Sequence, residues 1–448
     1  MSDVARDAGD DSVLERKLGP FDATAIVAGL VIGSGIFLTT GTIAQSLPDP
    51  GWILLAWACG GAVSLCGALA FAEMGALFPR AGGQYVFLRE SFGELPAFLF
   101  GWAYLLVIQS GSIAAVGVGF AEYLAYFVPG APRPATAVAL ILGLTWLNQR
   151  GVRESSALLN VVTTLKVAAI LGIALAGIWA LDVAGSVPAA ERAAVTLGPL
   201  PSWSGFGLAM IAVLWTFDGW NCVTFTAGEV RDPRRNLPLA LSAGTGLVTL
   251  CYLLVNYVYV AALPIPELQQ TTRVAERAVA HLFGQGATVL VVVLVLISTL
   301  GCINAMILTA PRIYFAMARD GLFFERLARV HPKRGTPAAA IWVQGVWGSL
   351  LALSGTYDQL FTLVMSAAIA FYAATGLSLF VLRRKHPAAE RVARTPGYPV
   401  TPLVFVIAMS LVLANTLWER PLESLWGCAL VAAGVPVWLF WRRKRGHT

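Results

Sequence analysis

The sequence predicts an all-α polytopic membrane protein of twelve transmembrane helices, in which two halves of five helices form an inverted repeat. Three observations predict this fold. Hydrophobic residues make up 57% of the 448 residues and charged residues only 12%, about half the charged share of a typical soluble domain. Apolar windows of about 20 residues, long enough to span a bilayer, recur along the chain. Two of them, the first and the sixth, are interrupted at their centres, as in inverted-repeat proteins.

The apolar windows also give the domain organisation. They cover residues 21–47, 52–78, 95–127, 134–151, 154–181, 205–228, 237–262, 287–317, 338–354, 357–382, 400–418 and 422–441. We expect a first repeat at 21–181, a second, inverted repeat at 205–382, and two further helices at 400–441. Residues 1–20 and 442–448 are expected to be cytoplasmic tails, because the first window lacks the flanking pattern of a signal peptide.

The charges orient the windows in the membrane. With the N-terminus inside, the cytoplasmic segments contain 25 of the 31 Lys and Arg residues, and the outer loops contain five. Positive side chains gather on the cytoplasmic side of a membrane. We therefore expect both termini inside and a location in the plasma membrane, the inner membrane of a bacterium. The net charge of +6 then reflects topology, and no nucleic acid partner is needed to explain it.

Cysteine and histidine usage excludes several kinds of site. All six cysteines lie in apolar segments, at positions 59, 66, 222, 251, 302 and 428. We therefore expect no disulfide framework and no covalently linked partner subunit. The four histidines lie in loops or tails, so the apolar windows lack the residue most used in acid–base catalysis. We expect no cofactor and no metal site.

The first window is interrupted by the sequence V-I-G-S-G-I-F-L-T at 31–39. Each glycine costs about 1 kcal/mol relative to alanine inside a helix, so Gly33-Ser34-Gly35 weakens the helix at its centre. Lipid cannot satisfy the backbone groups that a break frees, so the break must face protein or a cavity. A helix that restarts near Gly35 and Ile36 exposes free N–H groups and a positive dipole end, which suit a carboxylate.

The sixth window carries a matching interruption, L-W-T-F-D-G-W-N at 214–221. Because five windows separate the two interruptions, their helices run in opposite directions. The free carbonyls of Val31 and Ile32 in the first window, and those of Trp215 and Asp218 in the sixth, suit one ammonium group. Together the two interruptions predict a site for the backbone of a zwitterionic α-amino acid.

The alternative for Gly33-Ser34-Gly35 is a packing seam, since small residues let membrane helices approach closely. The matched interruption in the sixth window favours a binding site over a seam. A dinucleotide-binding loop is excluded, because the spacing of the glycines is wrong and no strand precedes them.

Longer motifs carry a resemblance to a known family. They are G-L-V-I-G-S-G-I-F (29–37), F-A-E-M-G-A-L-F-P-R-A-G-G-Q-Y-V-F-L-R-E (71–90), W-T-F-D-G-W-N (215–221), G-E-V-R-D-P-R-R-N-L-P-L-A (228–240), N-A-M-I-L-T-A-P-R-I-Y-F-A-M-A-R-D-G-L-F (304–323) and R-T-P-G-Y-P-V-T-P (394–402). With them the chain resembles the amino acid–polyamine–organocation (APC) superfamily, and within it the bacterial L-type-like amino acid transporters.

The resemblance implies a LeuT-like five-plus-five inverted repeat, with alternating access around a site at the membrane midplane. It implies that Ser34 and Gly35 meet the substrate carboxylate, and that the carbonyls of Val31, Trp215 and Asp218 meet its amino group. It also makes Trp215 part of an outer gate. The full set of expected substrate-binding residues is Val31, Ile32, Gly33, Ser34, Gly35, Ile36, Trp215, Phe217, Asp218, Gly219 and Asn221.

Two departures from relatives qualify the resemblance. Asn221 stands where proton-coupled arginine–agmatine antiporters carry a glutamate, which weakens any transfer of their proton sensing to this chain. Heteromeric animal members bind a heavy subunit through a cysteine in the loop after the third helix. Here that loop, V-P-G-A-P-R-P at 128–134, has no cysteine, so we expect no disulfide-linked heavy subunit.

Lys166 is the most unusual charge in the sequence. It lies about 20 Å along the fifth window from the cytoplasmic end, at 1.5 Å per residue, and a lysine at mid-depth costs about 2.5–3.5 kcal/mol. We expect its ammonium to contact the end of the inner half-helix near Gly29 and Leu30, and Ser298. There it would replace the cation of sodium-coupled relatives of the fold. A structural hydrogen-bonding role is the alternative, and the resemblance adds Tyr252 as a polar partner near the substrate.

Other polar residues leave alternatives open. Asp218 is expected to cap the break locally or to meet the substrate amine, and Glu73 to pair with a cytoplasmic-side arginine or to carry a proton. Glu122 is expected to be exposed to water at the outer end of the third window. Trp215 has packing as its alternative role. Further polar possibilities in the pocket are Ser110, Ser112, Asn304 and Ser366.

Three other functional classes compete with transport. A membrane-embedded enzyme would need a histidine or paired carboxylates inside the membrane, and a channel would show a polar stripe or charge ring. A sensor would need an appended signalling domain. None of these patterns is visible in the sequence. We expect a secondary transporter of α-amino acids with neutral side chains, working by sodium-independent exchange or uniport. The alternatives are proton symport and transport of cationic amino acids or polyamines.

Overall fold

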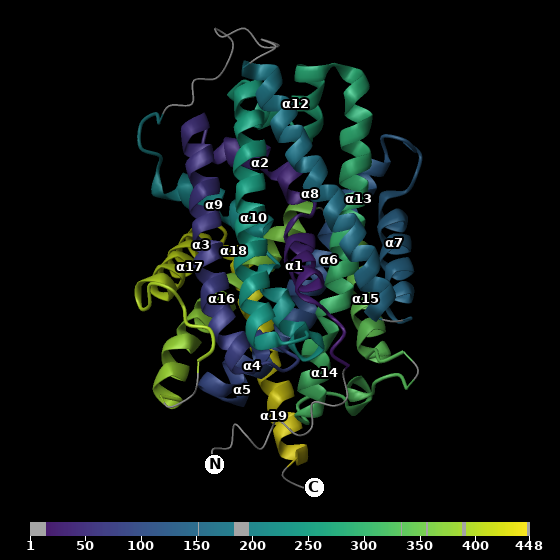
Figure 1. Ribbon diagram of the computed structural model, residues 1–448, viewed down its shortest axis with the longest axis vertical. Coiled ribbons are helices and arrows are strands. Elements are labelled where there is room, and N and C mark those ends of the chain that lie inside the picture. The colour runs from purple at the N-terminus through teal and green to yellow at the C-terminus, as the bar shows by residue number, and fades with distance from the viewer. Residues whose placement is uncertain are drawn as a thin grey trace.

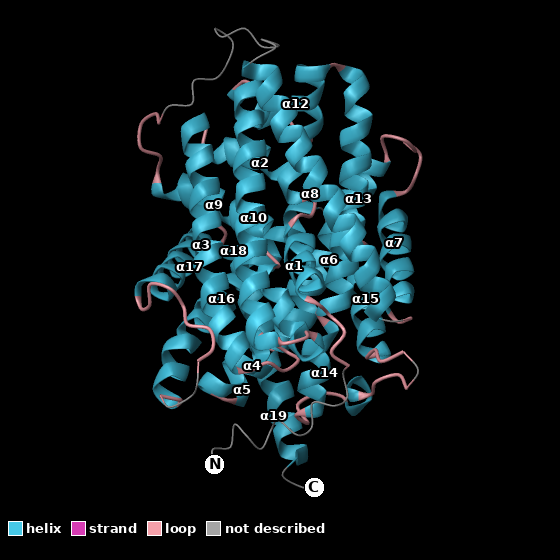
Figure 2. Ribbon diagram, in the orientation of Figure 1, coloured by secondary structure: helices cyan, strands magenta, loops and turns pink. Residues whose placement is uncertain are grey.

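The computed structural model describes residues 15–150, 152–182, 197–332, 334–354, 357–387 and 391–445. Within these ranges the regular elements are helices, and Leu18 and Val230 form an isolated parallel bridge. Figure 2 shows the helices joined by loops. In Figure 1 most helices run along the long axis, with α12 near one end and α4, α14 and α19 near the other.

The elements follow one another in this order: α1 (Pro20–Val31), α2 (Gly35–Ser46), α3 (Pro50–Leu77), α4 (Gln84–Phe92), α5 (Glu94–Ala103), η4 (Tyr104–Ile108), α6 (Gln109–Leu124), α7 (Arg133–Asn148), α8 (Val152–Asp182), α9 (Trp203–Phe217), η5 (Trp220–Glu229), α10 (Pro233–Ala262), α11 (Ile265–Gln270), α12 (Val274–Phe283), η6 (Gln285–Ala287), α13 (Thr288–Thr309), α14 (Pro311–Arg319), η7 (Glu325–Ala328), α15 (Ala338–Ala352), α16 (Tyr357–Lys385), α17 (Val400–Glu419), α18 (Pro421–Ala432) and α19 (Gly434–Arg445).

Ten helical segments among the described residues are long and apolar enough to cross a membrane. The expected windows at 134–151 and 338–354 correspond to the shorter helices α7, of 16 residues, and α15, of 15. Each has a proline just before its first residue, Pro132 and Pro337, and proline favours a helix start. At 1.5 Å per residue they are about 23 Å long, less than a bilayer core of about 30 Å. The count of twelve spans therefore stays a prediction.

Both expected interruptions are present. The first window divides into α1 and α2 at residues 32–34, and the sixth divides into α9 and η5 at Asp218 and Gly219. The second half of the sixth window is a 3₁₀ helix, which the sequence did not reveal. Thr224 and Thr226 donate side-chain hydrogen bonds to the carbonyls three residues earlier, a spacing that matches the 3₁₀ pattern.

The helices pack in two groups. In the first, α1 and α3 pack on α10, and α2 and α3 pack on α9; in the second, α6, α7, α13 and α15 pack on one another. Glycines at the crossings allow this approach: a Cβ at Gly60 of α3 would lie 2.2 Å from Val213 of α9, and one at Gly345 of α15 would lie 2.1 Å from Thr145 of α7. The two interruptions lie where the groups meet, since α1 also packs on α13.

Candidate functional site

The two interruptions face one cavity. Its lining is Leu30, Val31, Gly33, Ser34, Gly35, Val116, Trp215, Thr216, Asp218, Cys302 and Met306, and its volume is about 20 Å³. This is room for about one water molecule, so an amino acid can enter only if the lining moves. The expected residues Ile32, Ile36, Phe217, Gly219 and Asn221 are not part of the lining; the first four are next to lining residues in the sequence.

The N-terminus of α2 presents backbone donors to the cavity. Ser34 is the N-cap of this helix, and the first N–H groups of any helix have no partner within the helix. The two half-helices approach closely there: a Cβ at Gly35 would lie 2.8 Å from the hydroxyl oxygen of Thr216. Thr216 in turn lies 2.8 Å from Thr39 of α2, oxygen to oxygen. The geometry fits a carboxylate held at the start of α2.

The carbonyls that end α1 accept hydrogen bonds from side chains of three other helices. Lys166 Nζ of α8 donates to the carbonyls of Gly29 and Ile32, at 2.6 Å each. Ser298 of α13 donates to the carbonyls of Ile32 and Gly33, at 3.1 Å each. Both side chains are completely buried. The carbonyl of Ile32 therefore points at Lys166 and Ser298, while that of Val31 belongs to a residue of the lining.

Tyr252 of α10 connects the two interruptions. Its hydroxyl group donates to the carbonyl of Val31 at 2.8 Å and to that of Thr216 at 3.2 Å. Cys302 of α13 donates to the carbonyl of Leu30 at 3.1 Å. These bonds fix the backbone on both sides of the cavity, because the carbonyls of Leu30, Val31 and Thr216 each have a side-chain donor.

The second interruption depends on a glycine. Gly219 has a φ of +105°, a region that side chains with a Cβ rarely adopt. A Cβ there would also lie 3.0 Å from that of Leu30. The peptide N–H of Asp218 donates to the carbonyl of Trp215 at 3.1 Å, which closes the last turn of α9.

We expect Gly219→Ala to destabilise the protein by about 1–2 kcal/mol, the cost of a left-handed conformation for a residue with a Cβ. The measurement is the thermal unfolding midpoint of the purified protein in detergent. Gly246→Ala in α10 is the matched control, because nothing lies within 4 Å of a Cβ built there. Equal midpoints for the two variants would contradict the expectation.

Ion pairs join α3 to α16 and α4 to the end of α14; α4 and α14 lie near one end of the molecule (Figure 1). Glu73 of α3 accepts hydrogen bonds from Arg383 at 2.7 and 2.9 Å, and from the backbone and hydroxyl of Thr395 at 2.7 and 2.8 Å. Arg391 lies 3.2 Å from it. The carboxylate joins α3 to the end of α16 and to the segment before α17.

A second set of contacts at this end involves α4. Tyr85 donates to Asp320 at 2.7 Å, and Arg89 pairs with Asp320 at 2.9 Å. Burial, and then the neighbouring Asp320 carboxylate, raise the pKa of the Tyr85 hydroxyl above its usual value. Tyr85 therefore remains a neutral donor at every physiological pH.

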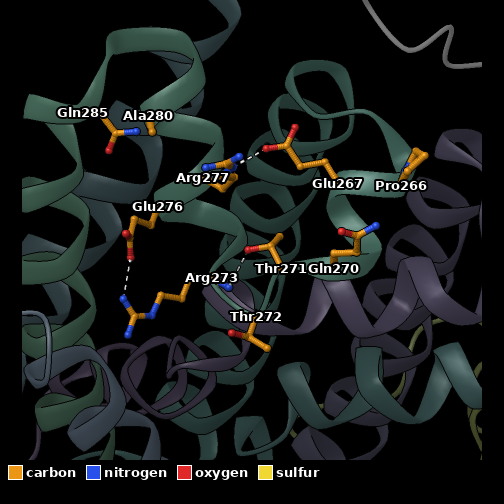
Figure 3. A pocket seen from close by; sticks show the side chains of 10 residues that line it. All are labelled: Pro266, Glu267, Gln270, Thr271, Thr272, Arg273, Glu276, Arg277, Ala280 and Gln285. Carbon is orange, nitrogen blue, oxygen red and sulfur yellow. Dashed lines mark hydrogen bonds and ion pairs between the residues drawn. The ribbon is translucent and has the colours of Figure 1, made fainter.

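A larger hollow, of about 690 Å³, lies at the α12 end (Figure 3). Its lining is Pro266, Glu267, Gln270, Thr271, Thr272, Arg273, Glu276, Arg277, Ala280 and Gln285, and it includes no residue of either interruption. Arg277 pairs with Glu267, and Arg273 lies 3.5 Å from Glu276. The segment is attached to α2, because Gln45 donates to the carbonyl of Gln269 at 2.9 Å.

Sequence reasoning missed several residues of the cavity region. Val116, Cys302 and Met306 line it, and Tyr372 of α16 donates to the Asp218 carboxylate. None of the polar possibilities Ser110, Ser112, Asn304 and Ser366 is part of the lining. Glu122 lies at the end of α6 and pairs with Arg133 at 3.0 Å.

Other kinds of site find no support in the described ranges. No group of three His, Cys, Asp or Glu side chains there could hold a metal ion. The six cysteines are free thiols. The charged groups nearest the cavity, Lys166 and Asp218, hold backbone carbonyls and a tyrosine hydroxyl respectively.

Comparison with known proteins supplies the family. Residues 18–437 match the model of the family described as amino acid permease. The chain is 33% identical to the b(0,+)-type amino acid transporter 1 of Mus musculus over 432 residues, which are 94% of this chain and 87% of the relative. It is 29% identical to the serine/threonine exchanger SteT of Bacillus subtilis (strain 168) over 441 residues, 97% of this chain and 99% of the relative. The chain belongs to the amino acid permease family of the APC superfamily.

Proposed function

We propose that the protein is a secondary transporter that exchanges α-amino acids across the plasma membrane by alternating access, and is not an enzyme. The observation that carries the proposal is the single cavity between two broken helices, lined by Ser34 and Gly35 from one and by Trp215 and Asp218 from the other. The relatives reported above are named as amino acid transporters and exchangers.

The substrate backbone lies between the two breaks. Its carboxylate accepts from the N–H groups that begin α2, near Ser34 and Gly35, where the dipole is positive. Its ammonium donates to the carbonyls of Val31, Trp215 and Asp218. The side chain faces Val116 and Met306, which line the rest of the cavity. This apolar lining supports neutral substrates.

Lys166 makes the exchange independent of sodium. Its ammonium already occupies a site between two carbonyls of α1, and oxygen ligands of this kind would otherwise suit a metal cation. Glu73 has a structural role, because its carboxylate accepts hydrogen bonds from Arg383 and Thr395 and forms an ion pair with Arg391. This supports exchange over proton symport.

The inverted repeat and its orientation complete the proposal. The first packing group contains the first and second windows (α1 with α2, and α3) and the corresponding sixth and seventh (α9 and α10). The second contains the third and fourth (α6 and α7) and the corresponding eighth and ninth (α13 and α15), as expected of residues 21–181 and 205–382 in an inverted repeat. The short helices α7 and α15 are the fourth and ninth of the twelve spans, and they pack against α6, α13 and each other. Both termini are cytoplasmic, residues 400–441 form two added spans, and the transporter works without a disulfide-linked subunit.

Counterflow in proteoliposomes tests the proposal. Vesicles loaded with an unlabelled amino acid should take up the labelled form against its gradient, whether or not sodium or a pH gradient is present. A panel of neutral, cationic and acidic amino acids gives the specificity, and empty vesicles measure net uptake. Absence of counterflow with every amino acid of the panel would overturn the proposal.

We expect Trp215→Ala to impair transport more than folding, with the rate of exchange reduced by at least about tenfold in protein that still folds. Trp215 lies in the lining and is 7% exposed, so its loss leaves the cavity open on one side. Trp418→Ala, at a side chain that is 82% exposed, is the control. Wild-type exchange by Trp215→Ala would assign this residue to packing alone.

A further inference from the structure

Asp218 has an accessible surface that its neighbours lack. It is half-buried and belongs to the lining of the cavity, whereas Phe217, Trp220 and Asn221 beside it are buried. Within the lining it is the one carboxylate. A carboxylate in this position would attract a positively charged side chain of a substrate, although the apolar residues of the lining, such as Val116 and Met306, favour a neutral one.

The hydroxyl of Tyr372 is hydrogen-bonded to this carboxylate. It donates to Oδ1 of Asp218, and it lies 3.2 Å from Oδ1 of Asn221. The Tyr372 ring is 7% exposed and is stacked on Trp220, with ring centroids 5.8 Å apart and planes at 24°. A neutral donor from α16 therefore holds this carboxylate from within the protein.

A chain of amides fixes Asn221, the second acceptor beside Tyr372. Its Nδ2 donates to Oε1 of Gln84 at 3.0 Å. Nε2 of Gln84 donates to the hydroxyl of Thr375 at 2.9 Å and to the carbonyl of Phe371 at 3.2 Å. Phe371, Tyr372 and Thr375 are neighbours on α16. With its amide held in this way, Asn221 keeps its oxygen toward Tyr372, and the tyrosine hydroxyl stays between two acceptors.

The energetic consequence concerns the side chain of the substrate. A partly buried carboxylate is costly unless donors satisfy it, and a hydrogen bond to an ionised acceptor, such as that from Tyr372 to Asp218, is roughly twice as strong as one between neutral groups. While Tyr372 supplies a donor, a cationic side chain must displace it and gains little. Without the hydroxyl, the carboxylate would lack a donor, and a substrate ammonium would supply it.

We propose that Tyr372 is a positioning residue that sets the preference of the site for neutral over cationic side chains, by holding the Asp218 carboxylate. This inference rests on the proposed transport of α-amino acids. It gives α16, which lies outside both interruptions, a role in substrate selectivity.

Norleucine and lysine form the test pair, because lysine adds an ammonium to the straight side chain of norleucine. The measurement is the ratio of kcat/KM for lysine to that for norleucine in proteoliposome exchange. In the wild type we expect norleucine to be preferred by at least about tenfold. In Tyr372→Phe, which keeps the ring on Trp220, we expect the ratio to move toward lysine by about tenfold, the range of a hydrogen bond to a charged group.

Two variants make the result specific. Tyr314→Phe also removes a buried hydroxyl, one without a hydrogen-bond partner in the described structure, and should leave the ratio unchanged. The double variant Tyr372→Phe with Asp218→Asn should lose the gain for lysine, because no charge remains to attract the ammonium. If Tyr372 had only a structural role, its substitution would change kcat/KM for lysine and for norleucine by the same factor.

Two results would overturn the inference. One is a wild type that takes lysine as well as norleucine, which needs no variant and so does not depend on the folding of Tyr372→Phe. The other is an unchanged ratio in Tyr372→Phe while norleucine is still exchanged. Failure of the wild type to exchange any amino acid would instead contradict the proposed function.

Discussion

Lys166→Ala should lower the initial rate of amino acid exchange by at least about tenfold. The Lys166 ammonium is fully buried and donates to the carbonyls of Gly29 and Ile32 at 2.6 Å each. A hydrogen bond that involves a charged group contributes about 1.5–3 kcal/mol, and 1.4 kcal/mol is about a factor of ten. Removing the ammonium leaves two carbonyls at the break without a donor, so the end of α1 loses its fixed position beside the cavity.

The sodium dependence of the variant separates two roles of Lys166. If the ammonium acts as a built-in cation, added sodium should restore part of the exchange in Lys166→Ala and should not affect the wild type. If Lys166 only joins helices, sodium should have no effect on either protein. Thr164→Ala, two residues away on an exposed position of α8 that bonds within its own helix, is the control. Unchanged exchange by Lys166→Ala would contradict both roles.

Arg312→Met should be the most destabilising of the substitutions considered, at about 3–5 kcal/mol, the usual cost of removing one partner of a buried ion pair. The Arg312 guanidinium donates to both carboxylate oxygens of Glu229, at 2.7 and 3.1 Å, and to the carbonyl of Leu308. Arg312 and Glu229 are 0% and 2% exposed. Without Arg312, the Glu229 charge would remain buried and unpaired.

The unfolding midpoint in detergent measures this effect. Adding Glu229→Gln to Arg312→Met should recover part of the loss, because no charge then stays buried alone. Arg277→Met is the contrasting control: its pair with Glu267 is 57% exposed on the arginine side, and exposed pairs contribute about 0–1 kcal/mol. Similar losses for Arg312→Met and Arg277→Met would show that the buried pair has no special importance.

Because of its position, loss of the Arg312–Glu229 pair should also disturb the segments that surround the cavity. The carbonyl of Glu229 accepts from the N–H of Leu18 at 2.9 Å, and the N–H of Arg231 donates to the carbonyl of Leu18 at 2.8 Å. The pair therefore joins α14 to η5, and η5 to the segment that leads into α1. All three segments adjoin the helices that form the cavity.

The sequence was most informative where a local signal is unusual for a membrane helix. Gly33-Ser34-Gly35 and Asp218-Gly219 indicated the two interruptions because glycine weakens a helix wherever it stands. Lys166 was recognisable because a mid-depth charge is costly in any fold. Such signals depend on the residue and its depth, and not on which helices meet.

Features that depend on distant contacts could not be read in this way. Val116 and Met306 resemble every other apolar residue of their helices, and only packing decides that they line the cavity. Tyr372 lies 154 residues after Asp218, and no pattern near either connects them. Arg312, which belongs to the cytoplasmic charges by sequence position, is fully buried. The 3₁₀ helix of η5 depends on threonine side chains whose rotamers the sequence does not show.

The two packing groups have a consequence for synthesis on the ribosome. α1 and α3 pack on α10, a helix that is translated only after α5 to α9 have been made. Until then the carbonyl of Val31 lacks Tyr252, and Gly61 of α3 lacks its neighbour Thr249 of α10. The early helices must therefore remain incompletely packed in the membrane until α10 is inserted. A truncated chain that ends before α10 should be a substrate for membrane proteases.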